Sequence, residues 1–452
     1  MSSFFSTAVA FLVVLGALII VHEWGHFIVA RLCGVKVLRF SVGFGKPLLS
    51  RKFGRDKTEW ALGAFPLGGY VKMLDEREDE VAPEELHRAF NRQSIAKRSA
   101  IVVAGPAANF LLAILVYWGI FWTGSEELMA FVGAPPAGSP AAVAGLVNGE
   151  QVRAVGGVKV ETWQDFGWLV LQGAANQDSV ELEVINEKNE IAFRRLPLAA
   201  VREQGWQGDG IARLGLTLYR KNLRPFLHKI MEGGVAEQAG LRVGDQILAV
   251  DNVPVMAVSE VVAKIRESAD RSLVMTIRRG KTEFAINLKP EISGEQDEKI
   301  GRIGVGIAEG GEVVRSVVRY DFLAAGAKAW RETREKSVFT LVMMGKMLTG
   351  EVSWRNLSGP VTIADYAGRS ARMGLDHYLR FLALVSISLG VLNLLPIPIL
   401  DGGHLLYHVA EVIKRSPLSE RVMELGQQIG MAILLVLMAF AFFNDINRLF
   451  SG

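Results

Sequence analysis

The sequence predicts a multi-pass α-helical membrane protein with four transmembrane helices, an inner membrane-associated β-hairpin region and two small α+β domains on the outer side. Hydrophobic residues make up 50% of the 452 residues. They are concentrated in four runs that are long enough to cross a bilayer, which takes about twenty residues. The middle of the chain has an ordinary soluble composition and contains an internal repeat. The net charge of +3 is too small to indicate nucleic-acid binding.

The apolar runs lie at residues 4–21, 100–122, 381–400 and 429–443. Extended by their uncharged flanks, they predict transmembrane helices at residues 1–33, 99–122, 375–403 and 426–448. The segments between them are an inner loop (34–98), two repeat domains (126–221 and 222–310), an outer connector (311–374) and an inner segment (404–425). Residues 321–348 predict an amphipathic helix, either at the outer interface or packed on the second repeat.

The distribution of basic residues predicts the orientation of the chain. No Lys or Arg precedes Phe4, whereas Arg31 and Lys36 follow the first run, so this run is not a cleaved signal peptide. The loop between the first two runs is rich in Lys and Arg, as short cytoplasmic loops are. We therefore expect the loop on the cytoplasmic side, and both termini and the repeats on the outer side.

The outer segment contains two copies of one pattern. Residues 144–155 read Ala-Gly-Leu-x-x-Gly-Glu-Gln-Val-x-Ala-Val, and residues 239–250 read Ala-Gly-Leu-x-x-Gly-Asp-Gln-Ile-x-Ala-Val. In each copy a turn leads into a strand, and then Gly156-Gly157 or Asp251-Asn252 predicts a tight hairpin. Helical segments follow at 160–171 and 255–268. This order resembles the PDZ domain, which binds extended peptides by adding a strand to a sheet edge; another small mixed sheet is the alternative.

The inner loop contains two segments with β character, residues 35–40 and 68–73, around Gly43-Phe44-Gly45. Irregular backbone near a membrane needs hydrogen-bond partners, which a β-hairpin folded against the transmembrane helices would provide. An exposed strand edge there would be able to hold an unwound peptide. An ordinary inner-face loop is the alternative, and the sequence does not decide between them.

His22-Glu23-Trp24-Gly25-His26 lies at the inner end of the first apolar run. Residues i and i+4 of a helix lie on one face, so both imidazoles are able to bind one metal ion. Glu23 is placed to act as general base on a water molecule beside that metal. Ionisable residues within a membrane span are costly, and they indicate a functional site by default.

A catalytic zinc site has three protein ligands, so one is missing. The third run ends Asn393-Leu-Leu-Pro-Ile-Pro-Ile-Leu-Asp401-Gly-Gly, where the prolines end a regular helix at the depth of the two histidines. Asp401 is the acid of this segment and the predicted third ligand. His404 and His408 form a second i, i+4 pair without an accompanying Glu, and we expect them beside the site or at the interface. Cys33 is expected to be a packing residue. No catalytic or metal-binding role is predicted for His87, His228 and His377.

These motifs together resemble the RseP-type site-2 proteases, a family of bacterial intramembrane zinc metalloproteases. The resemblance covers essentially the whole chain, including Gly105-Pro106-x-x-Asn109 in the second span. It implies a Zn²⁺ ion bound by His22, His26 and Asp401, with Glu23 as the catalytic base and Asn393 in contact with the substrate. It also implies an inner-membrane location, with the PDZ domains in the periplasm and the active site near the cytoplasmic side.

The resemblance further implies cleavage within transmembrane segments of proteins that have been trimmed beforehand, such as anti-sigma factors, and of signal-peptide remnants. The paired PDZ domains would then exclude substrates with bulky outer domains. A PDZ-containing membrane scaffold without catalysis is the alternative function. A metal transporter would require acidic or histidine residues in several spans, and the cores of the second and fourth spans have none.

Overall fold

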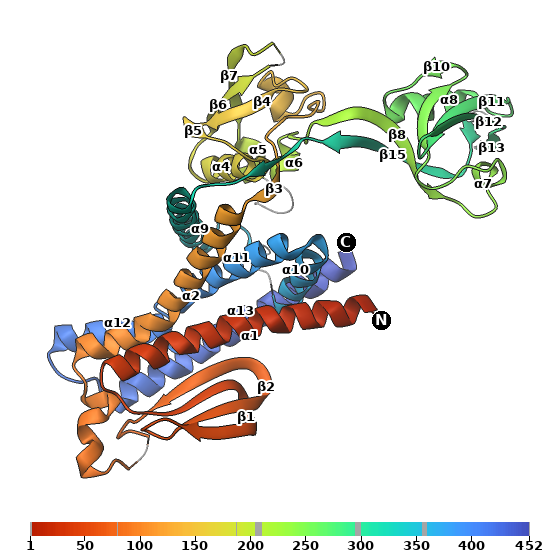
Figure 1. The fold of residues 1–452 in the computed structure, drawn as a ribbon. Helices are drawn as coiled ribbons and strands as arrows, with labels where there is room; N and C mark the ends of the chain where they lie inside the picture. Colours follow the sequence, from red (N-terminus) through yellow and green to blue (C-terminus); the bar gives the residue numbers. More distant parts are fainter. Residues whose placement is uncertain are drawn as a thin grey trace. The chain divides into compact units, whose positions relative to one another are not determined.

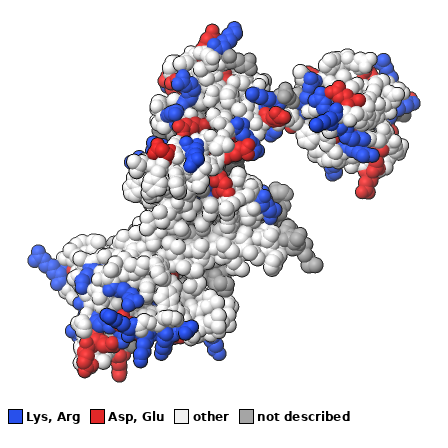
Figure 2. Space-filling view, in the orientation of Figure 1, with Lys and Arg blue, Asp and Glu red and all other residues white. Residues whose placement is uncertain are grey.

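The computed structural model describes residues 2–78, 80–186, 188–203, 210–293, 300–354 and 359–451 (Figure 1). Within these residues, four helices are long and apolar enough to cross a membrane. They are α1 (Ser2–Leu32), α2 (Ile95–Thr123), α11 (Leu375–Asn393) and α13 (Glu420–Ser451). On the face drawn in Figure 2, charged side chains are sparse over these helices and are frequent on the inner loop and on the repeat units. Each predicted run thus corresponds to one observed helix, but α11 ends at Asn393, ten residues before the predicted end of the third span at residue 403.

Helix α2 is the central element of the helical unit, because it packs against both α1 and α11. The crossing with α1 is close at Gly25, where an added Cβ would lie 2.8 Å from the Ala108 side chain. Small residues permit such close contacts between membrane helices. Helix α9 (Phe322–Thr349), predicted as an amphipathic helix, packs against α2 and α11. The Trp118 indole donates a hydrogen bond to the carbonyl of Phe322 at 2.9 Å.

The inner loop contains one long antiparallel pair, β1 (Val37–Phe53) and β2 (Thr58–Met73), which lies against α1. Both strands bend, so that residues 37–42 pair with 69–73 on one side, and residues 39–42 pair with 59–62 on the other. Residues 59–62 in turn pair with 49–52. Among the pairings between described residues, 69–73 thus form an edge segment with one neighbour. The predicted hairpin is present, and it is longer than the two segments that predicted it.

The two repeat copies have the same order of elements. The first consists of α3 (Pro140–Val143), β4 (Gln151–Val155), β5 (Val158–Lys159), α4 (Trp163–Asn176), β6 (Ser179–Ile185) and β7 (Ile191–Pro197). The second consists of α7 (Val235–Gln238), β9 (Gln246–Val250), β10 (Val253–Pro254), α8 (Val258–Glu267), β11 (Leu273–Arg279) and β12 (Thr282–Leu288). Positive φ at both residues of Gly156-Gly157 and of Asp251-Asn252 matches the hairpin turns predicted there. Helix α4 begins later than predicted because Thr162 and Asp165 form a capping box at its start.

The acidic residue of the repeated pattern has a structural role. In the first copy, Glu150 accepts a hydrogen bond from the backbone N–H of Val147 and pairs with Arg194 at 2.8 Å. In the second copy, Asp245 accepts one from Arg242 and pairs with Arg279 at 2.7 Å. Both carboxylates are buried, and a buried charge requires such partners. The pattern therefore stabilises the turn before each first strand.

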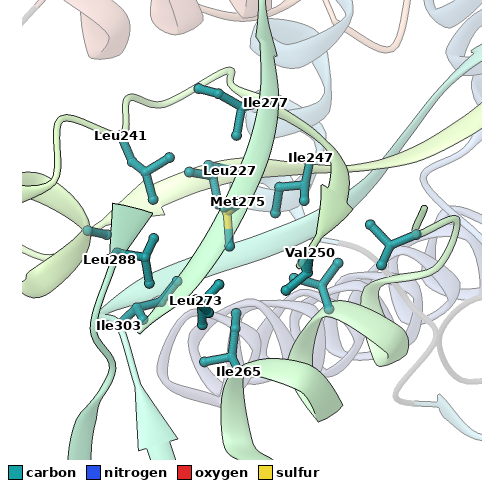
Figure 3. Packing of buried hydrophobic residues seen from close by; sticks show 13 residues of the cluster. Leu227, Leu241, Ile247, Val250, Ile265, Leu273, Met275, Ile277, Leu288 and Ile303 are labelled. Atoms are coloured by element: carbon teal, nitrogen blue, oxygen red, sulfur yellow. The ribbon is translucent and has the colours of Figure 1, made fainter. Parts of the chain in front are cut away.

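Apolar residues fill the interior of the second copy, as Figure 3 shows. Leu227, Ile247 and Met275 are fully buried, and each comes from a different strand of the sheet β12-β11-β9-β8-β15. Strand β8 (Arg220–Ile230) pairs along its length with β15 (Val305–Val313). The first copy has a four-stranded sheet of order β5-β4-β6-β7.

The remaining elements are short or connect the larger ones. They are the 3-10 helices η1 (Pro83–Arg88) and η2 (Phe90–Arg92), the helices α5 (Ala199–Glu203), α6 (Gly210–Arg213), α10 (Pro360–Met373) and α12 (Asp401–Lys414), and the strands β3 (Ser125–Leu128), β13 (Glu291–Ser293), β14 (Ile300–Arg302) and β16 (Arg315–Val318). Helix α10 packs against α1, α11 and α13.

Candidate metal centre

Helix α1 supplies two imidazoles to the site. His22 and His26 lie one turn apart, and their ring centroids are 4.8 Å apart at an interplanar angle of 83°. Both side chains are buried, and their Nε2 atoms face each other at 3.2 Å. The helical spacing of the motif therefore brings the two nitrogens together as the sequence predicts.

The segment between α11 and α12 brings a carboxylate to the same place. Helix α11 ends at Asn393 and α12 begins at Asp401, so the prolines lie in the non-helical stretch between them. Ile399 has a φ of 99°, which is a strained conformation for a β-branched residue and is found mainly where the surrounding structure enforces it. The predicted break is present, and it turns the Asp401 side chain towards α1.

The three predicted ligands form a cluster whose dimensions fit zinc. Asp401 Oδ2 lies 3.2 Å from His22 Nε2, and Oδ1 lies 3.5 Å from His26 Nε2. Ligand atoms about 2.0–2.1 Å from a tetrahedral zinc ion lie roughly 3.3–3.4 Å apart. No described group donates a hydrogen bond to the buried Asp401 Oδ2. Within the described residues, this is the one group of His, Cys, Asp and Glu side chains with metal-binding spacing.

Helix α2 forms the wall behind the imidazoles. His26 Nδ1 donates a hydrogen bond to the Ile101 carbonyl at 2.8 Å. One turn on, Gly105 leaves the space that the rings occupy, since an added Cβ would lie 2.8 Å from His22 Cε1. A further turn on, the Asn109 amide lies 3.2 Å from His22 Nδ1. These contacts were not predicted from the sequence, although a Gly and an Asn four residues apart in an apolar span indicate a close polar contact between helices.

Glu23 and Asn393 line a cavity of 760 Å³ that contains the cluster. The edge segment of β2 borders the same cavity through residues 69–71 and Met73. An added Cβ at Gly69 would lie 3.0 Å from Glu23 Cγ, so the edge passes directly beside this carboxylate. The Asn393 amide nitrogen lies 3.5 Å from His22 Nε2. The cavity thus brings together a carboxylate, an amide and an open strand edge next to the three predicted ligands.

The second predicted histidine pair, His404 and His408, lies outside the cluster of His22, His26 and Asp401. His404 and His408 line the cavity on the α12 side, and the Ser99 hydroxyl lies 3.0 Å from His408 Nδ1. Burial, followed by the nearby Arg98 guanidinium, lowers the pKa of His408 to about 4. Cys33 packs beside the apolar cluster of α1 and β1, as expected of a packing residue.

Comparison with known proteins identifies the family. The model of peptidase family M50 matches residues 10–437. This chain belongs to peptidase family M50. A zinc metalloprotease of Neisseria meningitidis is 41% identical over 449 residues, covering 98% of this chain and 99% of that protein. The regulator of sigma-E protease RseP of Escherichia coli is 39% identical over 460 residues, covering 99% of this chain and all of that protein.

The M50 protein described here is a zinc metalloprotease and an integral membrane protein. The resemblance noted from its motifs and the protease interpretation are thereby confirmed. A solved PDZ domain of the SdrC-like protein of Listeria monocytogenes matches 20% of the chain with a TM-score of 0.17 and 14% identity. A likeness this weak carries no argument about the fold of the repeats.

Proposed function

We propose that the chain hydrolyses peptide bonds within the transmembrane segments of other proteins. The observation that carries the proposal is the position of the His22, His26 and Asp401 cluster, which lies among apolar helices and not in an aqueous domain. A protease built in this way acts on a substrate that reaches it through the bilayer.

In this proposal His22, His26 and Asp401 hold the zinc ion, through both Nε2 atoms and the carboxylate. Zinc bound there supplies a positive charge that polarises the scissile carbonyl and lowers the pKa of water towards neutrality. Glu23 accepts the proton of the attacking water and passes it to the leaving amine. Its carboxylate lines the same cavity as the three ligands, so a single water molecule can lie between them.

The edge segment at residues 69–73 holds the substrate in an extended form. A helical substrate has its carbonyls in internal hydrogen bonds and must unwind before it is cleaved. Strand addition to an open edge replaces the lost bonds, and this edge runs beside Glu23. The Asn393 amide, which lies beside His22, donates a hydrogen bond to the substrate backbone.

The substrates are transmembrane segments that an earlier cleavage has shortened. The name of the Escherichia coli relative refers to sigma-E regulation, and we extend it to this chain as cleavage of a trimmed anti-sigma factor, together with signal-peptide remnants. The protein would lie in the bacterial inner membrane, with the active site near the cytoplasm. The two repeats would be periplasmic PDZ domains that exclude substrates with bulky outer domains.

The catalytic assignment is tested with purified protein in detergent. We expect Glu23→Gln to retain zinc and to lose turnover by about 10²–10⁴-fold, as the loss of a general base does. His22→Ala and Asp401→Ala are expected to lose zinc as well. Glu424→Gln is the matched control, because Glu424 lines the same cavity but is not part of the His22, His26 and Asp401 cluster. Zinc retention and full turnover in Asp401→Ala would refute the ligand set.

The exclusion role of the repeats is tested separately by deleting residues 126–310. The deletion variant should cleave full-length and trimmed substrates at similar rates, whereas the whole chain should prefer the trimmed one. Equal selectivity of the two proteins would refute the exclusion role. The catalytic assignment would be unaffected, because the cluster lies outside the deleted segment.

A further inference from the structure

Helix α2 presents one face to both histidines. Ile101, Gly105 and Asn109 follow each other at intervals of four residues, so they lie on one side of the helix. The Ile101 carbonyl accepts a hydrogen bond from His26, and the missing side chain of Gly105 leaves space for both rings. The Asn109 amide lies against His22. Asn109 is fully buried, which is unusual for an amide in an apolar span unless it has a partner.

The contact with Ile101 determines the protonation of His26. A backbone carbonyl only accepts hydrogen bonds, so the proton of a neutral His26 is on Nδ1. The lone pair is then on Nε2, which is the atom that faces His22 and Asp401. A metal ligand needs this lone pair. The carbonyl of Ile101 therefore keeps His26 in the form that binds metal.

His22 requires the same form and therefore needs an acceptor at its Nδ1. The group within hydrogen-bond distance is the Asn109 amide, at 3.2 Å. If the amide nitrogen donated to Nδ1, the proton of the imidazole would be on Nε2 and would point into the ligand cluster. Turning the planar amide by 180° places Oδ1 at this position instead, where it accepts from Nδ1–H. Oδ1 has no hydrogen-bond partner among the described residues in its present orientation.

We propose that Asn109 is a positioning residue whose side-chain carbonyl accepts a hydrogen bond from His22 Nδ1–H and so directs the lone pair of Nε2 to the metal. The Ser386 hydroxyl, which donates to the Asn109 backbone carbonyl at 2.8 Å, attaches this turn of α2 to α11. Helix α2 then sets the tautomer of both imidazoles. This inference rests on the proposed ligand set.

The test is a competition between the protein and a chelator series, which measures zinc affinity independently of proteolysis. Losing the partner of a metal-bound histidine typically weakens metal binding 10–100-fold, and we expect this loss for Asn109→Leu. Asn109→Asp keeps an acceptor of the same shape and should bind zinc at least as tightly as wild type. Asn444→Leu is the matched control, because Asn444 is a buried amide of α13 that donates to the Trp354 carbonyl.

The outcomes separate this inference from the ligand assignment. Wild-type affinity in Asn109→Leu, or equal loss in Asn109→Leu and Asn109→Asp, would overturn the role of Asn109. Zinc retention in His22→Ala would instead overturn the ligand set. If Asn109→Leu does not fold, Asn109→Asp decides alone. Affinity at or above the wild-type value supports the inference, and weaker binding overturns it.

Discussion

The close contact of Gly105 with both imidazoles makes Gly105→Ala the most direct test of the metal centre. The added Cβ would lie 2.8 Å from His22 Cε1 and 2.6 Å from His26 Cε1. Non-bonded carbon atoms are stable at about 3.5 Å or more. The added Cβ would lie still closer to His26 Nε2, so the His26 ring would have to move by more than about 0.9 Å, whereas metal ligands tolerate deviations of about 0.2 Å.

The expected loss follows from the energy of overpacking. Inserting a methyl group into a filled interior typically costs about 1–3 kcal/mol. If the overpacking destabilises the zinc-bound state by this amount, zinc affinity decreases by about 5- to 150-fold, because every 1.4 kcal/mol changes a binding constant tenfold. Turnover at limiting zinc should decrease in parallel.

The assay compares Gly105→Ala with Gly119→Ala in the chelator competition and in cleavage of a transmembrane peptide. Gly119 lies on the same helix, and no described atom is within 4 Å of its added Cβ. Gly119→Ala gains the same helix propensity, but its added methyl group does not contact His22 or His26. Wild-type zinc affinity and turnover in Gly105→Ala would refute the packing argument.

Three further predictions concern stability. The pKa of His408 is lowered from 6.5 to about 4, so the unfolded chain binds more protons than the folded one between these pH values. The free energy of unfolding should therefore fall as the pH decreases below about 6.5, by at most about 3 kcal/mol. His408→Gln should flatten this dependence in chemical denaturation, and an unchanged slope would contradict it. Asp445 accepts hydrogen bonds from the backbone of Gly359 and Val361 at the start of α10, so Asp445→Ala should cost about 1–2 kcal/mol, seen as a lower melting temperature in detergent. Arg279→Gln leaves the buried Asp245 carboxylate unpaired, and amide hydrogen exchange in β9 should become faster, while exchange in β4 stays at the wild-type rate.

Several parts of the fold could be predicted because local sequence determines them. The apolar runs became helices, since their length and hydropathy leave a membrane span few other conformations. The repeated pattern became two copies of one arrangement, because its glycine turns and hairpin residues require specific backbone angles. The extent of the inner β-hairpin was underestimated. Its bent strands pair over residues such as Arg51 and Lys52, which have no alternating pattern.

The sequence by itself predicted which side chains form the candidate metal-binding cluster. The spacing of His22 and His26 in a helix, and the proline-broken end of the third span before Asp401, are local properties of the chain. The tertiary structure alone decided what lies behind these side chains. Ile101 and Asn109 reach the imidazoles because α1 and α2 cross at Gly25, and this close approach depends on the absence of side chains between the helices.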